Sequence, residues 1–336
     1  MRARATAWVF PLVLLAAMSP KLDAQPPLVP VVDLHVDLSY QFNYQERPFS
    51  HGTGQYPAKE LVRAGVMGIV LPLYIPKSVD PEGPRLGDLE RSYVSVFDAV
   101  LRTPPYRLFG CTPQRREIQT WLAFEGSAPL GQRPDEVAVW VARGVRLFGL
   151  VHSYDNRLAG SSGANSNLGL TAEGRALVTR IHQLGGVVDV SHASDRASDE
   201  VIALAKRQGR PVVATHSNAR ALAPHRRNLT DSQLLGIAAT GGVVGVNFHQ
   251  PFLASRGKSA SLSDVVRQVR YIARLAGIDA VALGSDFEGD IRPVPELGDA
   301  RAFRRLADAL RADGMSEQEI RKAFYKNALR VLCPAP

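Results

Sequence analysis

Short apolar runs rich in β-branched residues alternate with longer amphipathic runs along almost the whole chain. The alternation is typical of strands that pair in parallel and are covered by helices. The clearest helical runs are Thr171–Leu184, Asp195–Gln208, Ser261–Ala276 and Asp299–Ala312. The eight runs predicted as strands are Val31–Asp37, Val66–Ile75, Thr120–Glu125, Val145–His152, Gly186–His192, Pro211–His216, Gly242–Asn247 and Ala280–Asp286.

Eight strand–helix units over roughly 300 residues predict an α/β fold of the (β/α)8 type, a TIM barrel. A doubly wound open sheet is the alternative, but it would place a glycine-rich phosphate loop after the first strand, and the sequence has none there. The long segment Asp80–Arg115 is expected to contain a helix over Asp88–Leu101. A final helix is expected over Ser316–Leu332, because SEQE at its start is a capping-box pattern.

The first 24 residues have the features of an export signal. Arg2 and Arg4 precede an apolar run from Ala7 to about Met18, and small residues follow up to a cleavage point after Ala24. The apolar run is shorter than the roughly 20 residues that span a bilayer. We therefore predict a signal peptide over 1–24, no stable membrane anchor after cleavage, and a periplasmic or secreted protein with one metallohydrolase domain over 25–336. An uncleaved anchor is the alternative.

Charge and cysteine content narrow the function classes. Removal of residues 1–24 lowers the formal charge from +8 to +6, and the basic residues are spread along the chain without an aromatic-interleaved patch. This distribution is typical of a solvated surface and argues against nucleic-acid binding. Cys111 and Cys333 lie far apart in the sequence, so a disulfide and two free thiols both remain open.

Polar side chains with metal-binding chemistry stand where the predicted strands end. Four of the eight histidines do so, together with three carboxylates and Asn247. A single histidine or aspartate at a strand end is commonly a hydrogen-bonded residue or a helix cap. In a barrel, however, all carboxyl ends of the strands meet on one rim, where active sites lie. The joint pattern therefore predicts a metal site from His35, Asp37, Glu125, His152, His192, His216 and Asp286.

The number of these groups indicates two metal ions. A single zinc ion in a catalytic site takes three protein ligands and keeps an open position. Five ligands with one carboxylate that bridges suit a pair of ions about 3.5–4 Å apart. We assign His35 and Asp37 to one ion, His192 and His216 to the other, and Glu125 to both.

The ordered motifs resemble those of the membrane (renal) dipeptidase family of zinc dipeptidases. They include DLHVD at 33–37, AFEG at 123–126, GGVVDVSHASD at 185–195, HRRNLTDSQL at 225–234 and GIDAVALGSDFEG at 277–289. The resemblance extends from about Val31 to the C-terminus. It departs from the family after His152, where SYDNRLAGSSGANSN replaces the usual loop and alters the predicted pocket wall.

The resemblance implies a role for each matching residue. The five ligands assigned above match those of two Zn²⁺ ions per chain. His152 matches a histidine that contacts the substrate and helps hold its carbonyl oxygen. Asp286 matches the aspartate that handles protons, and Arg227 matches the arginine that binds the terminal carboxylate of the substrate. The neighbouring Arg226 is the competing candidate for that last role.

The resemblance implies hydrolysis of dipeptides by a water that the metal pair activates, with tolerance of a D-residue on the C-terminal side. The alternatives are a related amide, lactam or lactone hydrolase on the same site, and an exported binding protein that has lost catalysis. The intact set of site residues argues against the last alternative. The expected partners are small dipeptides; a homodimer is one oligomeric state that the sequence leaves open.

Overall fold

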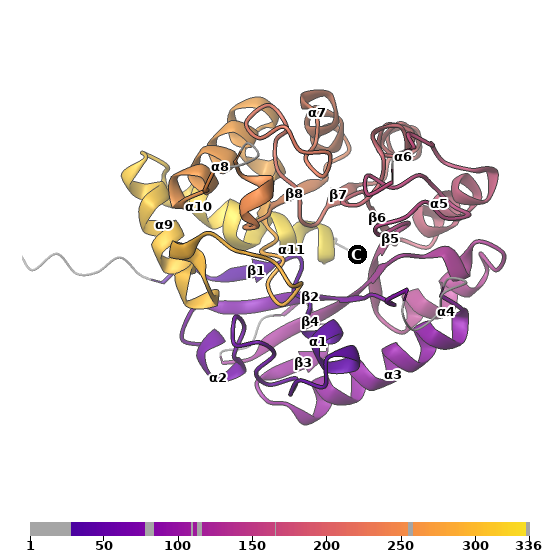
Figure 1. Ribbon diagram of the computed structural model, residues 1–336, viewed down its shortest axis with the longest axis horizontal. Coiled ribbons are helices and arrows are strands. Elements are labelled where there is room, and N and C mark those ends of the chain that lie inside the picture. The colour runs from indigo at the N-terminus through magenta and orange to yellow at the C-terminus, as the bar shows by residue number, and fades with distance from the viewer. Residues whose placement is uncertain are drawn as a thin grey trace, which may run out of the picture.

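The centre of the protein is a closed ring of parallel strands in the computed structural model, which describes residues 28–77, 84–108, 110–112, 116–164, 166–254 and 258–333. The sheet order is β2-β1-β9-β8-β7-β6-β5-β4-β3, and β2 also pairs with β4, which closes the ring. Figure 1 shows the strands at the centre with the helices outside. The strands are β1 (Val31–Asp33), β2 (Val66–Leu73), β3 (Tyr106–Leu108), β4 (Ile118–Glu125), β5 (Val145–Gly149), β6 (Val187–Asp189), β7 (Val212–Ala214), β8 (Val243–Val246) and β9 (Val281–Leu283).

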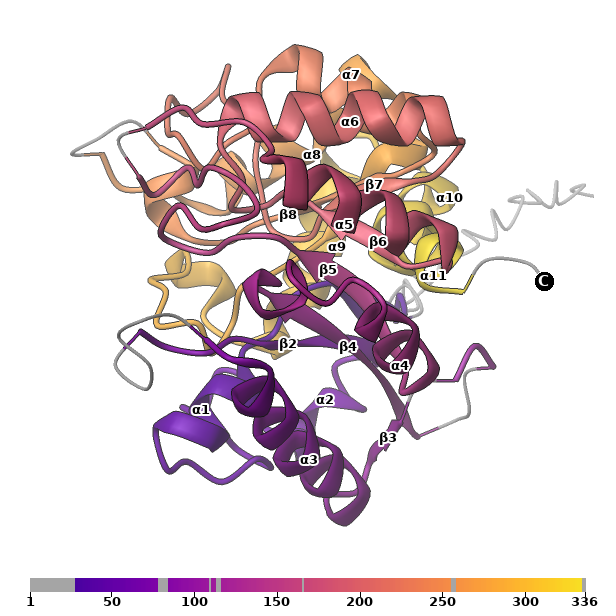
Figure 2. The ribbon, with the colours of Figure 1, turned by 90° about the vertical axis from the view of Figure 1, so that its right-hand side faces the viewer.

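Most helices lie between the strands in sequence and cover the ring on its outside (Figure 2). Several begin with a side-chain cap; for example, the hydroxyl of Ser194 accepts a hydrogen bond from the backbone of Ala197 at the start of α6. The α-helices are α1 (Leu38–Tyr44), α2 (Ala58–Leu61), α3 (Leu86–Arg102), α4 (Glu136–Ala142), α5 (Ala172–Gln183), α6 (Asp195–Gln208), α7 (Asp231–Ala239), α8 (Leu262–Ala276), α9 (Phe303–Ala312), α10 (Glu317–Arg321) and α11 (Asn327–Leu332).

This architecture confirms the predicted (β/α)8 barrel, with two corrections. The segment Asp80–Arg115 contains β3 as well as the expected helix, and β3 pairs with the first residues of β4 outside the closed ring. Most strands also end earlier than predicted; β6 ends at Asp189, so His192 lies in the turn beyond it. The hydrogen-bonded ladder between the strands stops at these ends, because the chain then enters turns. The polar side chains of these turns lie at the mouth of the barrel.

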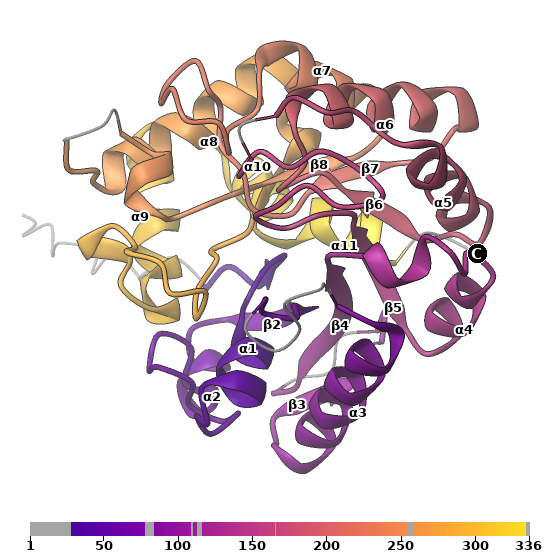
Figure 3. The ribbon, with the colours of Figure 1, turned by 45° about the vertical axis from the view of Figure 1, so that its right-hand side comes forward.

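Two apolar layers hold the barrel. One lies between the strands and the surrounding helices. The other fills the ring itself, where Val32, Trp121 and Val213 pack together with Val331 and Leu332 of the C-terminal helix. Figure 3 shows α11 close to the centre of the ring of strands. The C-terminal helix therefore completes the barrel core and leaves the opposite end for polar groups.

The structure resolves the question of the cysteines. A disulfide joins Cys111, between β3 and β4, to Cys333, which follows α11. The predicted signal peptide lies outside the described residues. Among the residues that the structure describes, no helix combines the length and apolar character needed to cross a membrane.

Reduction of this disulfide is expected to destabilise the protein. The bridge closes a loop with a sequence separation of 222 residues, so its loss increases the conformational entropy of the unfolded chain. We expect a cost of about 2–5 kcal/mol in the free energy of unfolding. Urea unfolding with and without reductant measures it. The double variant Cys111→Ser, Cys333→Ser is the control, since reductant has nothing to act on there, and an unchanged wild-type midpoint in reductant would contradict the prediction.

Candidate active site

The polar rim is built by the segments that follow the strands. After β1, the chain runs through His35 and Asp37 beside the segment that follows β9, since the backbone N–H of Asp286 donates to His35 O at 3.1 Å. Asp286 has a left-handed backbone, with φ of 66°. A left-handed residue is uncommon outside glycine and marks a backbone held by its surroundings. The two segments thereby turn their side chains toward one another.

Glu125, the last residue of β4, is the centre of the cluster. Its Oε1 lies 2.9 Å from His192 Nε2, 3.3 Å from His35 Nε2, 3.7 Å from His216 Nε2 and 3.9 Å from His152 Nε2. The ligand atoms of three overlapping sets lie within 4.8 Å of one another: His35, His216 and Asp286; Glu125, His152 and His192; and His35, Asp37 and Glu125. The structure thus brings together the five assigned ligands, and the sets also include His152 and Asp286 of the predicted metal site.

The cluster fits a cation because the Nε2 atoms of its histidines face one another and the carboxylates of the cluster. His35 Nε2 is buried and has no hydrogen-bond partner among the described residues, although Asp37 Oδ2 is 3.5 Å away. His192 Nε2 and His216 Nε2 face each other at 3.0 Å. Buried polar atoms are normally hydrogen-bonded, and imidazole nitrogens with carboxylate oxygens are the donors that zinc prefers. The residues present therefore fit a divalent metal.

Burial and charge set the protonation of this cluster. Burial lowers the pKa values of His192 and His216 well below the ordinary value, which leaves these imidazoles neutral. Burial also opposes the charged form of His35, but the negative charges of Glu125 and Asp37 outweigh it and raise its pKa to about 10. Burial raises the pKa of Asp286 to about 6. The site thus holds neutral imidazoles at His192 and His216, while the neighbouring carboxylates favour the charged form of His35.

Arg227 lies in the same cavity as the cluster. The cavity has a volume of about 330 Å³ and is lined by Asp37, Glu125, His152 and Arg227, among others. Arg227 is 8% exposed, and its Nη1 has no hydrogen-bond partner among the described residues. Its guanidinium lies over the ring of Phe252, 5.6 Å from the centroid. A buried charge without a partner is costly, so this guanidinium is suited to an anionic ligand.

Arg226 occupies a different environment. Its Nη1 donates to the carbonyl oxygens of Ser162, Gly163 and Ala164 at 3.1, 3.3 and 2.7 Å. These bonds commit it to the loop that follows His152, outside the residues that line the cavity. The structure thus distinguishes the two adjacent arginines that the sequence left open.

Three histidines outside the predicted metal site also have clear positions. His249 lines the cavity, and the ring of His225 packs on Phe252 at a centroid distance of 4.6 Å. His182, within α5, contacts Gln208 Oε1 through Nδ1 at 2.6 Å and takes no part in the site.

Tyr74 is a site residue that the sequence reasoning missed. It follows β2 directly, lines the cavity, and its ring lies 4.3 Å from that of His152. The prediction at the strand ends considered only residue types that bind metals, and tyrosine was not among them. Tyr74 also fell inside the predicted strand Val66–Ile75, which was expected to continue beyond the observed end of β2 at Leu73. Its place near the carboxyl end of that strand was the available signal.

The chain matches known proteins over most of its length. Residues 27–335 match the membrane dipeptidase family, peptidase family M19. An uncharacterised Klebsiella pneumoniae protein from the pqqA 5′ region is 40% identical over 220 residues, which cover 62% of this chain and 79% of that protein. An uncharacterised dipeptidase of Schizosaccharomyces pombe is 31% identical over 221 residues, which cover 65% of this chain and 53% of that protein. The chain spans about half the length of the curated dipeptidases that it matches.

A solved structure has the same fold. A metallopeptidase from Rhodobacter sphaeroides, liganded with a phosphinate mimic of the dipeptide L-Ala-D-Ala, superposes with a TM-score of 0.78. It is 24% identical, and the match covers 91% of this chain and 99% of that one. A closed parallel barrel with histidines and carboxylates on its C-terminal rim defines the class of metal-dependent barrel hydrolases. Within that class, this chain belongs to the membrane dipeptidase family, peptidase family M19.

Proposed function

We propose that this protein is an exported dipeptidase that holds two zinc ions per chain and hydrolyses the peptide bond of free dipeptides. The observation that carries the proposal is the buried Arg227 guanidinium, whose Nη1 has no hydrogen-bond partner among the described residues, in one small cavity with the Glu125-centred cluster. A cation site next to an anion site suits a substrate with a reactive carbonyl and a free carboxylate a short distance apart. Dipeptides have that arrangement, and longer peptides place the carboxylate farther from most of their bonds.

His35 and Asp37 would hold one zinc ion, His192 and His216 the other, and Glu125 would bridge them. When bound, such a pair lowers the pKa of a water and polarises the scissile carbonyl. Arg227 binds the terminal carboxylate through its guanidinium fork and fixes the register of the substrate.

His152 and Asp286 act on the reacting atoms. His152 Nδ1 lies 2.8 Å from Ser153 Oγ, while its Nε2 faces the cluster and can donate to the carbonyl oxygen. Asp286 Oδ2 accepts a hydrogen bond from Asn247 Nδ2 at 2.9 Å, which orients the carboxylate. Asp286 takes the proton of the attacking water and passes it to the leaving amine.

Two further aspects are part of the proposal. Export is supported by the disulfide between Cys111 and Cys333, because disulfides persist mainly in oxidising compartments. Fractionation of the native host tests it, and a protein found in the cytosol with residue 1 intact would contradict export. Tolerance of a D-residue on the C-terminal side is supported by the L-Ala-D-Ala mimic in the Rhodobacter sphaeroides metallopeptidase.

A substrate panel tests the activity. Dipeptides with L- or D-residues at the C-terminal side, N-acyl amino acids, lactams and lactones would be incubated with the zinc-loaded protein, with and without a chelator. We expect chelator-sensitive cleavage of dipeptides. Cleavage of lactones or N-acyl amino acids alone would instead assign the related hydrolase function.

Metal analysis tests the cofactor, with about two zinc ions expected per chain, as a paired-metal site requires. Asp37→Asn is expected to lower the zinc content toward one, since Asp37 is assigned to one ion only. Asp308→Asn, on the outer surface of α9, is the control and should retain both ions. A stoichiometry below one in the zinc-reconstituted wild type would contradict the metal pair.

A further inference from the structure

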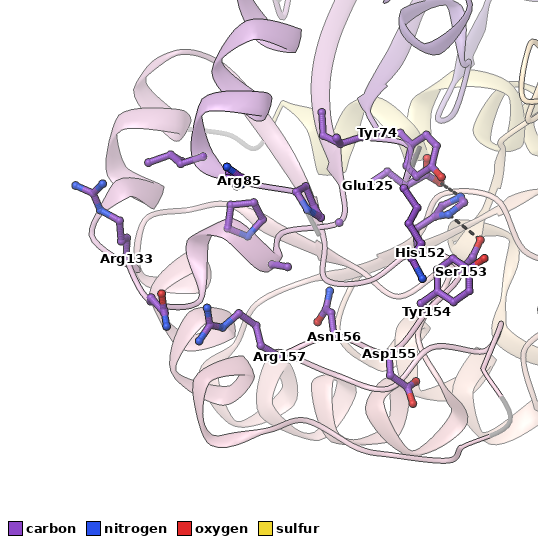
Figure 4. Close-up of a pocket in the computed structure, with 18 residues that line it drawn as sticks. Tyr74, Arg85, Glu125, Arg133, His152, Ser153, Tyr154, Asp155, Asn156 and Arg157 are labelled. Atoms are coloured by element: carbon purple, nitrogen blue, oxygen red, sulfur yellow. Dashed lines mark hydrogen bonds and ion pairs between the residues drawn. The ribbon is translucent and has the colours of Figure 1, made fainter. Parts of the chain in front are cut away.

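A second cavity opens from the first one. It has a volume of about 680 Å³, roughly twice that of the cavity with the cluster, and shares with it Tyr74, Glu125 and His152. Figure 4 shows these three side chains on one side and Asn156, Arg133 and Arg157 on the other. Volumes of this size are typical of small-molecule sites. A ligand bound at the cluster can therefore extend past His152 into further enclosed space.

Two of the arginines that line this second cavity, Arg133 and Arg157, have carboxylate partners. Arg157 Nε donates to Glu173 Oε2 at 2.7 Å, and Arg133 Nη2 lies 3.0 Å from Glu136 Oε1. Both guanidinium charges are thus compensated by carboxylates. Lys77 differs, because its ammonium lies over the ring of Tyr154, 4.7 Å from the centroid, and forms no ion pair within the described part of the chain.

Among the described residues, neither of the two acidic residues that line this cavity pairs with Lys77. Glu125 belongs to the metal cluster. The carboxylate of Asp155, which also lines this cavity, accepts hydrogen bonds from the backbone N–H of Ser161 at 2.7 Å and from the hydroxyl of Ser166. It is therefore committed to its own loop, and Figure 4 shows it turned away from Asn156 and Arg157.

The position of Arg227 determines the orientation in which a dipeptide binds. Arg227 lines the first cavity and not the second. A dipeptide with its carboxylate at Arg227 and its scissile carbonyl at His152 has its N-terminal residue beyond His152. We propose that the second cavity receives the N-terminal side chain of the substrate and that Lys77 makes an acidic side chain the preferred one. This inference rests on the proposed dipeptidase function.

Two substrates that differ in one charge test the preference for an acidic N-terminal side chain. L-Glu-L-Ala and L-Gln-L-Ala have nearly the same size and differ in one charge, so the ratio of their kcat/KM values measures charge recognition. We expect the wild type to favour the glutamyl substrate about fivefold at low ionic strength, as one partly exposed ion pair provides, and less in high salt. Lys77→Met keeps the apolar stem over Tyr154 and should bring the ratio close to one. Lys206→Met, on the outer surface of α6, removes the same charge elsewhere and should keep the wild-type ratio.

The outcomes separate this inference from the proposed function. Cleavage of both substrates with a wild-type ratio of one, or an unchanged ratio in Lys77→Met, would overturn the acidic subsite and leave the dipeptidase intact. If the zinc-loaded wild type cleaves none of L-Glu-L-Ala, L-Gln-L-Ala and L-Ala-L-Ala, both the dipeptidase function and the acidic subsite are contradicted.

A different observation concerns the hydroxyl of Thr215, which lies between two cluster histidines. Thr215 Oγ1 is 2.8 Å from His216 Nδ1 and 3.3 Å from His35 Nδ1. The same oxygen is 2.5 Å from Asp189 Oδ2. Asp189 Oδ1 accepts from the backbone N–H groups of Ser191 and Thr215 and from the hydroxyl of Ser191. All of these atoms are buried, so their hydrogen bonds can be counted.

The count determines which ring nitrogens carry protons. A threonine hydroxyl has one proton and two lone pairs. The Thr215 proton goes to Asp189, which as a carboxylate can only accept. Ser191 Oγ also lies 3.1 Å from Thr215 Oγ1, but its single proton goes to Asp189 Oδ1 at 2.7 Å, so it donates nothing to Thr215. The two lone pairs are then left for the two imidazoles, so both histidines present Nδ1–H to Thr215. Their Nε2 atoms are thereby free to face Glu125 and the metal positions.

We also infer that Thr215, oriented by Asp189, is a positioning residue that fixes the ligating tautomer of both His35 and His216. The inference rests on their proposed role as zinc ligands. Thr215→Val keeps the shape and removes the hydroxyl, and should weaken zinc binding about 10- to 100-fold, as loss of a partner behind a metal ligand does. Thr215→Ser keeps the hydroxyl and should bind zinc within about threefold of the wild type.

Chelator competition at fixed pH measures the zinc affinity, and thermal unfolding of the metal-free proteins detects a general loss of structure. If Thr215→Val does not fold, Thr215→Ala, which removes the hydroxyl without adding bulk, takes its place with the same expected loss. Wild-type zinc affinity in the folded variant would overturn the inference. A wild type that binds no zinc would instead contradict the proposed metal site.

Discussion

The variant Asp286→Asn is expected to lower kcat for dipeptides by about 100- to 10,000-fold, the range that a positioned general acid–base provides. The carboxylate stands next to the cluster, and burial raises its pKa to about 6, while His35 and Asn247 oppose that rise. A pKa close to neutral suits a group that first accepts and then returns a proton. An amide of the same size cannot accept that proton.

Asparagine is a well-matched replacement at this position. Asp286 has a φ of 66°, and asparagine is among the few residues that adopt left-handed backbone readily. Steady-state kinetics together with zinc analysis measure the effect. Retention of about two zinc ions with the expected loss of kcat supports proton transfer, whereas a comparable loss of zinc would assign Asp286 to metal binding. Turnover within threefold of the wild type would contradict the role altogether.

The barrel could be predicted from the sequence because buried strands have a recognisable pattern of apolar residues. Strands of a parallel barrel are covered on both faces and therefore read as short continuous apolar runs. The strand β3 left no comparable trace, since Arg107 is exposed and the strand pairs only with one edge of β4. The lengths of the strands were also overestimated, because the residues that turn out toward the rim continue the apolar pattern for two or three positions.

The site was predictable to the extent that it depends on strand ends. Glu125, His192 and His216 could be grouped because barrel topology places all strand ends on one rim. The contacts behind them could not be predicted. The role of Thr215 follows from its distances to Asp189 of β6 and to His35 beyond β1, as well as to the adjacent His216. For the first two residues, separation along the sequence carries no information about such distances. The environments of Arg226 and Arg227 likewise depend on how one loop packs, which no local pattern determines.

The variant Arg227→Met is expected to lower kcat/KM for a dipeptide by about 100- to 1,000-fold, mainly through KM, as loss of a buried charge partner does. The zinc content should not change. The replacement keeps an apolar stem over Phe252 and removes the guanidinium. A substrate with a blocked carboxylate removes the same interaction from the other side. Replacing L-Ala-L-Ala by L-Ala-L-Ala amide should lower kcat/KM of the wild type about as much as the Arg227→Met substitution lowers kcat/KM for L-Ala-L-Ala. The variant should then have about the same kcat/KM for the free and the amidated dipeptide.

The stability of the Arg227→Met variant distinguishes a role of Arg227 in substrate binding from a role in maintaining the structure. The guanidinium of Arg227 is buried, and its Nη1 has no hydrogen-bond partner in the part of the chain that the structure describes. Its Nη2 donates to His216 O over a long distance, 3.5 Å. Replacement of a buried charge by an apolar group of similar volume is often neutral or stabilising. The free energy of unfolding should therefore stay equal or rise in Arg227→Met while substrate binding falls. A structural arginine would show the opposite, a loss of stability with little change in the discrimination between the free and the amidated dipeptide.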